Sequence, residues 1–192
     1  MLAYENLPVT PCPESVECQR HEALYVTLSK PLINSLGKFL EGKKVLECYA
    51  GRGHLSALLQ RKGIDIKPTS LQMGHDCSAD MGHVTEVEVC SVMEAVQRYR
   101  HWMQVLLVTW PIADDSLFRV LPHLPKGCPI IFIGEVTDYA RKPFPFLGGC
   151  ATDQFFEAVR ELPELTGQLE YPTCRQDTLK VFQYRGREIQ SS

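Results

Sequence analysis

One acidic residue and two glycines follow an apolar segment at a spacing that suits the binding of a cofactor. The acid Glu47 comes directly after Val45 and Leu46, and Gly51 and Gly53 follow it. Glycine allows a tight turn and lets the backbone come close to a ligand. In open α/β sheets, a strand that ends in such a turn and leads into a helix forms a cofactor-binding corner. The three-glycine dinucleotide fingerprint and the Gly-Lys-Ser/Thr of a phosphate loop are both absent, which excludes those two classes of loop.

The elements that would position these residues can be read from the neighbouring sequence. The apolar pair Val45 and Leu46 predicts a buried strand over 44–48. The segment over 54–62 predicts a helix, because Leu55, Leu58 and Leu59 recur at helical spacing. One face of that helix is therefore apolar and can pack against a sheet. A strand, turn and helix without any ligand is the alternative interpretation of this segment.

The pattern Glu-x-x-Ala-Gly-x-Gly after an apolar strand resembles the first motif of class I S-adenosylmethionine (SAM)-dependent methyltransferases. The resemblance implies that Glu47 lies near the methionine amino group of the cofactor. It also implies that the cofactor lies over the loop formed by Ala50, Gly51 and Gly53. Tyr49 stands where many members of this family have a glycine, so we expect a bulkier loop.

Strands and helices alternate along most of the chain, which predicts an α/β fold with a doubly wound, mostly parallel sheet. Two closing strands without a long helix between them predict a C-terminal antiparallel hairpin at one edge. This pattern is similar to the seven-stranded sheet of the methyltransferase family. We expect one domain over 1–192, with an N-terminal arm and covering helices over 1–42 and an α/β core over 43–186. The expected strands are 44–48, 64–70, 84–89, 103–109, 129–134, 167–171 and 178–184, and the expected helices are 14–29, 32–40, 54–62, 92–100, 113–121 and 152–162.

Strand ends are the informative positions, because ligands of α/β sheets bind outside the carboxyl ends of the strands. Methyltransferases usually carry an acid for the ribose hydroxyls at the end of the second strand, where this chain has Ser70. They often carry an acid or amide near the adenine at the end of the third strand, where this chain has Cys90 and Ser91. A serine makes a hydrogen bond but lacks the two oxygens of a carboxylate. The two serines indicate weak SAM binding, another nucleoside ligand, or no ligand.

Two further strand ends supply candidate residues for chemistry. Thr109 ends the fourth strand beside the expected cofactor, and Trp110 follows it. Trp110 could stack on a planar substrate or on adenine, or it could be a packing residue at the edge of the sheet. Glu135, after the fifth strand, is the candidate general base or amine-binding carboxylate. Asp114 and Asp115 could bind a cationic substrate amine or serve as the acids of a helix N-terminus.

The loop over 136–150 is rich in proline, phenylalanine and glycine. Its last residues, in the segment over 148–153, form either a lid over the site or part of a packed surface loop. As a lid it would place Tyr139, Phe144 and Phe146 on its apolar underside.

Composition and charge exclude several other classes of protein. The net charge of −3 and the scattered Lys and Arg residues leave no track for nucleic acid. No apolar run approaches the roughly 20 residues of a membrane span, and the N-terminus shows no secretory signal. The eight cysteines include no Cys-x-x-Cys pair, so we expect them to be mostly reduced and the protein to be cytoplasmic. Ligand-type residues between His75 and His83 are irregularly spaced, so we expect no metal site.

The sequence therefore predicts a divergent class I methyltransferase-like domain with SAM as its cofactor. An active enzyme would act on a small-molecule or peptide-like substrate. The alternative is an inactive member of the fold that serves as a nucleoside-binding or protein-interaction module, and a homodimer is compatible with either function. The expected catalytic residues are Trp110 and Glu135, and the expected cofactor-binding residues are Glu47, Tyr49, Ala50, Gly51, Gly53, Ser70, Ser91 and Thr109.

Overall fold

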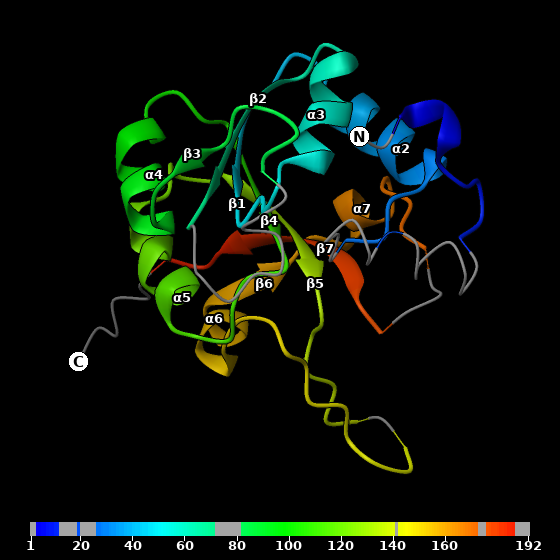
Figure 1. Ribbon diagram of the computed structural model, residues 1–192. Helices are drawn as coiled ribbons and strands as arrows, with labels where there is room; N and C mark the ends of the chain where they lie inside the picture. The colour runs from blue at the N-terminus through cyan, green and yellow to red at the C-terminus, as the bar shows by residue number, and fades with distance from the viewer. Residues whose placement is uncertain are drawn as a thin grey trace.

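The computed structural model describes residues 3–11, 19, 26–71, 82–140, 142–172 and 176–186. These residues form a seven-stranded sheet in the order β3-β2-β1-β4-β5-β7-β6 (Figure 1). The first five strands along the chain pair in parallel, whereas β7 is antiparallel to both β5 and β6. The predicted doubly wound, mostly parallel sheet with antiparallel C-terminal strands is confirmed.

The elements follow one another along the chain in the alternation that the sequence predicts. The strands are β1 (Lys44–Cys48), β2 (Asp65–Ser70), β3 (Glu88–Val89), β4 (Val105–Thr109), β5 (Pro129–Gly134), β6 (Val159–Glu161) and β7 (Thr178–Tyr184). The α-helices are α2 (Lys30–Leu40), α3 (His54–Arg61), α4 (Val92–Tyr99), α5 (Ser116–Val120), α6 (Asp153–Ala158) and α7 (Pro163–Thr166), and short 3-10 helices cover Tyr4–Asn6 and Leu121–His123.

Two apolar clusters hold helices against the two faces of the sheet. The apolar residues of α2 and α3 pack with Val45 and Leu107 on one face. The apolar residues of α4, α5 and α6 pack with Leu46 and Leu106 on the other face. All five residues of β4 are buried, as expected for a central strand covered on both faces. This burial fixes the carboxyl ends of β1 and β4 side by side, where the glycine turn begins.

The start of α2 differs from the expected arrangement. Ser29 is the N-cap, and its hydroxyl accepts a hydrogen bond from the backbone N–H of Leu32 at 3.3 Å. Pro31 therefore lies in the first turn of α2, where a missing N–H costs nothing, instead of ending an earlier helix. Of the helix expected over 14–29, residues 26–29 are not helical, and most of the remainder lies outside the described residues.

The C-terminal edge is antiparallel as predicted, but one of its strands was placed wrongly. The segment expected as a strand over 167–171 is irregular. The strand β6 is formed instead by Val159–Glu161, which belongs to the end of the helix expected over 152–162. The helix ends at Ala158 because the β-branched Val159 adopts an extended conformation and buries its side chain in the core. Three residues are too few to show a period of two in the sequence.

The expected strand over 84–89 is also shorter than predicted, since only Glu88–Val89 pair with β2. The residues before β3 pack over the glycine turn instead, and the backbone N–H of Val84 donates to the carbonyl of Arg52 at 2.9 Å. Within the described ranges, no helix has the length and apolar character needed to cross a membrane.

Candidate functional site

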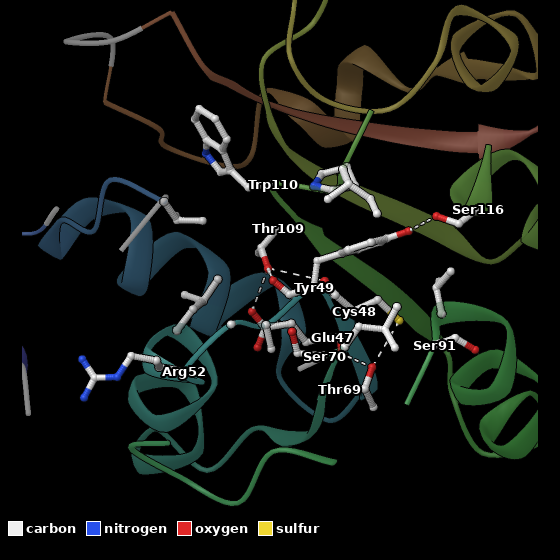
Figure 2. Close-up of a pocket in the computed structure, with 18 of the residues that line it drawn as sticks. Glu47, Cys48, Tyr49, Arg52, Thr69, Ser70, Ser91, Thr109, Trp110 and Ser116 are labelled. Carbon is white, nitrogen blue, oxygen red and sulfur yellow. Dashed lines mark hydrogen bonds between the residues drawn. The ribbon is translucent and has the colours of Figure 1, made fainter. Parts of the chain in front are cut away.

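A cavity of about 370 Å³ opens at the carboxyl ends of the central strands. Its walls come from the ends of β1, β2 and β4 and from the turns that follow them (Figure 2). Gly53 and Glu135 do not line it. The other residues expected at the site all do: Glu47, Tyr49, Ala50, Gly51, Ser70, Ser91, Thr109 and Trp110.

Glu47 supplies a buried carboxyl group to this cavity. Its side chain is only 1% exposed, and it accepts hydrogen bonds from the hydroxyls of Ser56 and of Thr109, the latter at 3.2 Å. Burial raises the pKa of Glu47 to about 7, although the hydrogen bonds from Ser56 and Thr109 act in the opposite direction. A cationic group of a ligand would stabilise the charged carboxylate here, so the site has the chemistry to bind an ammonium group.

Ser56 is the partner of Glu47 that sequence reasoning missed. It lies in α3 between the buried residues Leu55 and Ala57 and is itself fully buried. The sequence did contain a signal for this role, because Ser56 is a polar residue on the apolar face of the helix that follows the glycine turn. Thr109 was expected near the cofactor, and its hydroxyl also lies 3.0 Å from the carbonyl oxygen of Tyr49, so it ties the end of β4 to the turn.

The two glycines of the turn have different structural roles. Both have positive φ, +54° at Gly51 and +80° at Gly53, which favours glycine. A Cβ atom at Gly51 would meet no atom within 4 Å, so this position faces open space in the cavity wall. A Cβ atom at Gly53 would lie 2.7 Å from Val87 and 2.8 Å from Thr85. Gly53 is therefore explained by close packing under the segment before β3, not by direct approach to a ligand.

Tyr49 has the bulky side chain that was expected in the turn, but this side chain points away from the glycines. Its backbone φ is +62°, a value that is uncommon for a residue other than glycine. The ring runs from the turn towards the start of α5, where the tyrosine and Ser116 hydroxyls lie 2.7 Å apart (Figure 2). Burial raises the pKa of Tyr49, so the phenol is neutral near pH 7. The ring therefore narrows the side of the cavity next to α5 and leaves the surface above Gly51 open.

The two serines at the strand ends are not equivalent. Ser70 ends β2 and lines the cavity, at the position where the resemblance implies an acid. Ser91 is the N-cap of α4 and forms a capping box with Glu94. Its hydroxyl lies 2.7 Å from a carboxylate oxygen of Glu94 and accepts from the backbone N–H of Glu94 at 3.3 Å. These contacts use the hydroxyl of Ser91 to begin α4, a role that the Ser-x-x-Glu pattern signals in the sequence.

Trp110 borders the cavity immediately after β4. Its φ is +52°, and its backbone N–H donates to the carbonyl of Ile133 at 2.7 Å. The indole is partly buried and packs against both apolar clusters. Both sequence interpretations of Trp110 are thus compatible with its place, since a packed indole also forms part of the cavity wall.

The acids that follow Trp110 serve the start of α5. A carboxylate oxygen of Asp114 accepts from the backbone N–H of Ser116 at 2.9 Å, and Asp115 forms an ion pair with Arg119 at 2.7 Å. Asp114 also lines the cavity, so it is the second acid in the wall beside Glu47. The structure therefore supports the helix-terminus interpretation of these acids, and it leaves Asp114 accessible from the cavity.

Glu135 and the loop that follows it do not cover the cavity. A carboxylate oxygen of Glu135 accepts from the backbone N–H of Gly149 at 3.1 Å, which closes the base of the loop. The loop extends away from the body of the molecule (Figure 1), and only Gly149 of this segment lines the cavity. Phe144, expected on the underside of a lid, is 78% exposed. The part of the loop that carries Phe144 is therefore not the underside of a lid over its own cavity, whereas in the segment over 148–153 Gly149 lines the cavity and Cys150 and Ala151 are buried.

The described residues contain no group of three or more His, Cys, Asp or Glu residues that could hold a metal ion. The candidate segment from His75 to Asp80 lies outside the described residues. Among the described cysteines, Cys48, Cys90, Cys128 and Cys150 are buried and not in disulfides. Burial raises the pKa of the Cys48 thiol to about 12, so it is an apolar part of the cavity wall and not a nucleophile.

Comparison with known proteins identifies the fold. No model of a protein family matches this chain, and no curated protein does. Among solved structures, the SAM-dependent methyltransferase SibL in its apo form is 15% identical, with a TM-score of 0.52 over 96% of this chain and 62% of that one. An O-methyltransferase family protein from Burkholderia thailandensis is 13% identical, with a TM-score of 0.47 over 88% of this chain and 60% of that one. The chain thus spans about three fifths of the length of these structures. It has the fold of class I SAM-dependent methyltransferases, as the sequence resemblance predicts.

Proposed function

We propose that this chain binds SAM in the cavity at the carboxyl ends of β1, β2 and β4 and transfers its methyl group to an acceptor bound beside Trp110. One observation carries the proposal: the buried carboxyl group of Glu47 and the open side of Gly51 border the same cavity. The missing side chain at Gly51 leaves room for a nucleoside, and the buried acid can pair with an ammonium group.

The cavity has the size and polarity for such a cofactor. Its volume of about 370 Å³ lies within the roughly 300–1,000 Å³ range of small-molecule sites. Glu47 would hold the cationic end of the cofactor, Gly51 would lie beneath it, and Ser70 would offer one hydrogen bond to the ribose. SAM supplies a methyl group that its sulfonium already activates. The chain therefore acts mainly by positioning the two molecules and excluding water, and a proton displaced from the acceptor leaves to solvent.

The residues after β4 would hold the acceptor. Trp110, Pro111 and Ile112 form an apolar part of the wall, and Asp114 is the acid next to them. An indole can stack on a planar acceptor, and a dry wall keeps water from the reacting atoms. Glu135 lies outside the cavity lining and accepts a hydrogen bond from Gly149. We therefore assign it the role of holding the base of the loop in shape, and no role in proton transfer.

A second function is favoured by the chemistry at Ser70 and Ser91. Among the described residues, the cavity lining has no carboxylate at the end of β2, and the hydroxyl of Ser91 is used to cap α4. A protein that keeps this fold without tight SAM binding would serve as a nucleoside-binding or interaction module. The two functions differ in one measurable property, which is transfer of the methyl group.

Titration calorimetry of the full chain with SAM and with S-adenosylhomocysteine tests the proposal. A missing charge-assisted hydrogen bond at Ser70 costs about 1.5–3 kcal/mol, so we expect a Kd in the range of tens of micromolar or weaker. Gly51→Ala should weaken binding about tenfold or more, because its methyl group enters the cavity. The matched control is Gly63→Ala, since Gly63 also has positive φ and open space but lies outside the cavity lining.

Radiolabelled methyl transfer to a panel of small-molecule and peptide acceptors then separates the two functions. Binding with transfer supports the enzyme, and binding without transfer to any acceptor favours the module. Failure of both ligands to bind, or equal weakening by Gly51→Ala and Gly63→Ala, would contradict the proposed site.

A further inference from the structure

The exposed large apolar side chains gather mainly in two places on the described surface. The first is the loop over 136–149, here termed the arm, where Tyr139, Phe144 and Leu147 are 64%, 78% and 70% exposed. The second is the rim of the cavity, here termed the mouth, where Leu71, Val89 and Ile112 are 44%, 53% and 42% exposed. Clusters of exposed apolar side chains are uncommon on monomers and mark sites of interaction.

The arm is held in its extended shape by contacts at its base and along its length. Asp138 and Phe146 exchange backbone hydrogen bonds of 2.8 and 2.9 Å, and the hydroxyl of Tyr139 donates to Asp153 at 2.8 Å. At the base, a Cβ atom at Gly148 would lie 2.6 Å from the carbonyl oxygen of Glu135. The two backbone segments of the arm therefore approach so closely at its base that position 148 has no room for a side chain. This close contact gives the hairpin a defined shape, which can present apolar side chains.

The mouth is continuous with the cavity. Leu71 and Ile112 line the cavity, and Val89 pairs in register with Ser70, which also lines it. A ligand that enters would pass these side chains. They come from the ends of β2 and β3 and from the segment after β4, so a cover placed over them would lie against the part of the cavity wall that Leu71 and Ile112 form.

The arm of one molecule leaves its own mouth uncovered. It begins at the edge of the cavity, where Gly149 is part of the wall, and then extends away from the body of the molecule (Figure 1). A single copy of the chain thus exposes both sets of apolar side chains to water. Burying them against another surface would be favourable, because apolar surface gains free energy when it leaves water.

We propose that two copies of this chain form a symmetric dimer in which the arm of each copy covers the mouth of the other. In this arrangement the two-fold axis passes near Gly149, where the arm joins the cavity edge, and the same contact is made twice. The charges agree with this pairing, since the arm carries the exposed Lys142 and the exposed Asp114 follows Ile112 at the mouth, whereas Asp115 is already paired with Arg119. Each copy then supplies the lid of the other's site, with Phe144 and Leu147 towards the apolar rim.

The dimer contact can be measured by sedimentation velocity without any ligand. The wild-type chain should be dimeric at tens of micromolar, and the double variant Phe144→Asp/Leu147→Asp should be monomeric and folded by circular dichroism. Val9→Asp is the matched control, because Val9 is 65% exposed but belongs to neither set. A monomeric wild-type chain, or a double variant that stays dimeric, would overturn the proposal, as would wild-type monomers that bind anionic vesicles through the arm.

A photo-cross-linker at position 144 identifies the surface that the arm meets. With p-benzoylphenylalanine in place of Phe144, irradiation should give a product of twice the chain mass, joined to peptides that contain Leu71, Val89 or Ile112. Cross-links to any other surface would contradict the arm–mouth contact. The role of the arm as a lid rests on the proposed function, but the dimer does not. Loss of SAM binding in dimeric protein would count against the proposed function alone, and monomeric protein that binds SAM would count against the dimer alone.

Discussion

Replacing Glu47 with glutamine should change the pH dependence of stability in a defined direction. Glutamine has the shape of glutamate but carries no charge. Its carbonyl oxygen can keep one of the two hydrogen bonds from Ser56 and Thr109, and the remaining hydroxyl can turn to accept from the amide. The substitution therefore removes a titrating group from the interior and keeps the packing around it.

The magnitude follows from the two pKa values of Glu47. Burial raises its pKa in the folded protein to about 7, against 4.5 in an exposed position. The folded protein thus binds this proton more tightly than the unfolded chain does. The resulting stabilisation is complete below about pH 4.5 and is lost as the pH rises through about 7. Converted to free energy, the difference is on the order of 3 kcal/mol between acid and pH 8.

Urea unfolding at pH 5, 6, 7 and 8 measures this effect as a difference between the wild type and Glu47→Gln. The other titrating groups are shared, so they largely cancel in the difference. We expect the wild type to lose about 2–3 kcal/mol relative to the variant between pH 5 and 8. The control is Glu94→Gln, because hydrogen bonds from Ser91 lower the pKa of Glu94, and its pH-dependent contribution is lost only at more acidic pH.

A constant difference between the wild type and Glu47→Gln from pH 5 to pH 8 would refute the reasoning. It would mean that the carboxyl group titrates at the same pH in the folded and the unfolded chain. The same burial predicts that a cationic ligand displaces the proton of Glu47. Titration calorimetry with SAM at pH 6.5 in two buffers of different ionisation enthalpy should therefore report proton release, and Glu47→Gln should abolish it.

The remaining predictions concern the turn and the end of β2. Gly51→Ala and Gly63→Ala should each cost about 1–2 kcal/mol through positive φ, or roughly 2–8 °C in Tm, and only Gly51→Ala should weaken SAM binding. Gly53→Ala adds overpacking against the 84–87 segment and should cost about 2–5 kcal/mol in urea unfolding, so a cost equal to that of Gly63→Ala would contradict the packing role. Ser70→Asp should tighten SAM binding about ten- to a hundredfold by calorimetry; unchanged affinity would place the ribose elsewhere.

The central strands could be predicted from the sequence because burial on both faces leaves a direct trace. Val105 to Val108 are apolar without interruption, and Lys44–Cys48 leads straight into the glycine turn. The short edge strands left no such trace. Glu88–Val89 and Val159–Glu161 are defined by the strands they pair with, and three residues or fewer cannot display a period. The sequence thus predicts the antiparallel pairing at the C-terminal edge correctly, but it predicts the position of β6 wrongly.

At the site, too, features set by neighbouring residues in the sequence could be predicted, and features set by contacts distant in the sequence could not. The acid and the glycines were recognised because they lie within seven residues of one another, from Glu47 to Gly53. The actual reason for Gly53 is its contact with Val87, which no local pattern reveals. The capping role of Ser91 was readable from Glu94 three residues later, but the resemblance to a family drew attention to a cofactor contact instead.

Backbone strain at two strand ends is an argument for function that does not depend on the resemblance. Tyr49 follows β1 and Trp110 follows β4, and both aromatic residues have positive φ, +62° and +52°. Such a conformation costs on the order of 1–2 kcal/mol for a residue other than glycine. It persists only where neighbouring contacts fix it, as the Tyr49–Ser116 hydroxyl pair and the Trp110 N–H to Ile133 carbonyl bond do here. Because β1 and β4 are neighbours, both strained residues border the one cavity that Glu47 also lines. Strained backbone tends to be kept at ligand sites, where the surrounding structure holds it. Two strained residues in the wall of a cavity that also contains a buried carboxyl group therefore favour a wall whose shape is used to hold a ligand.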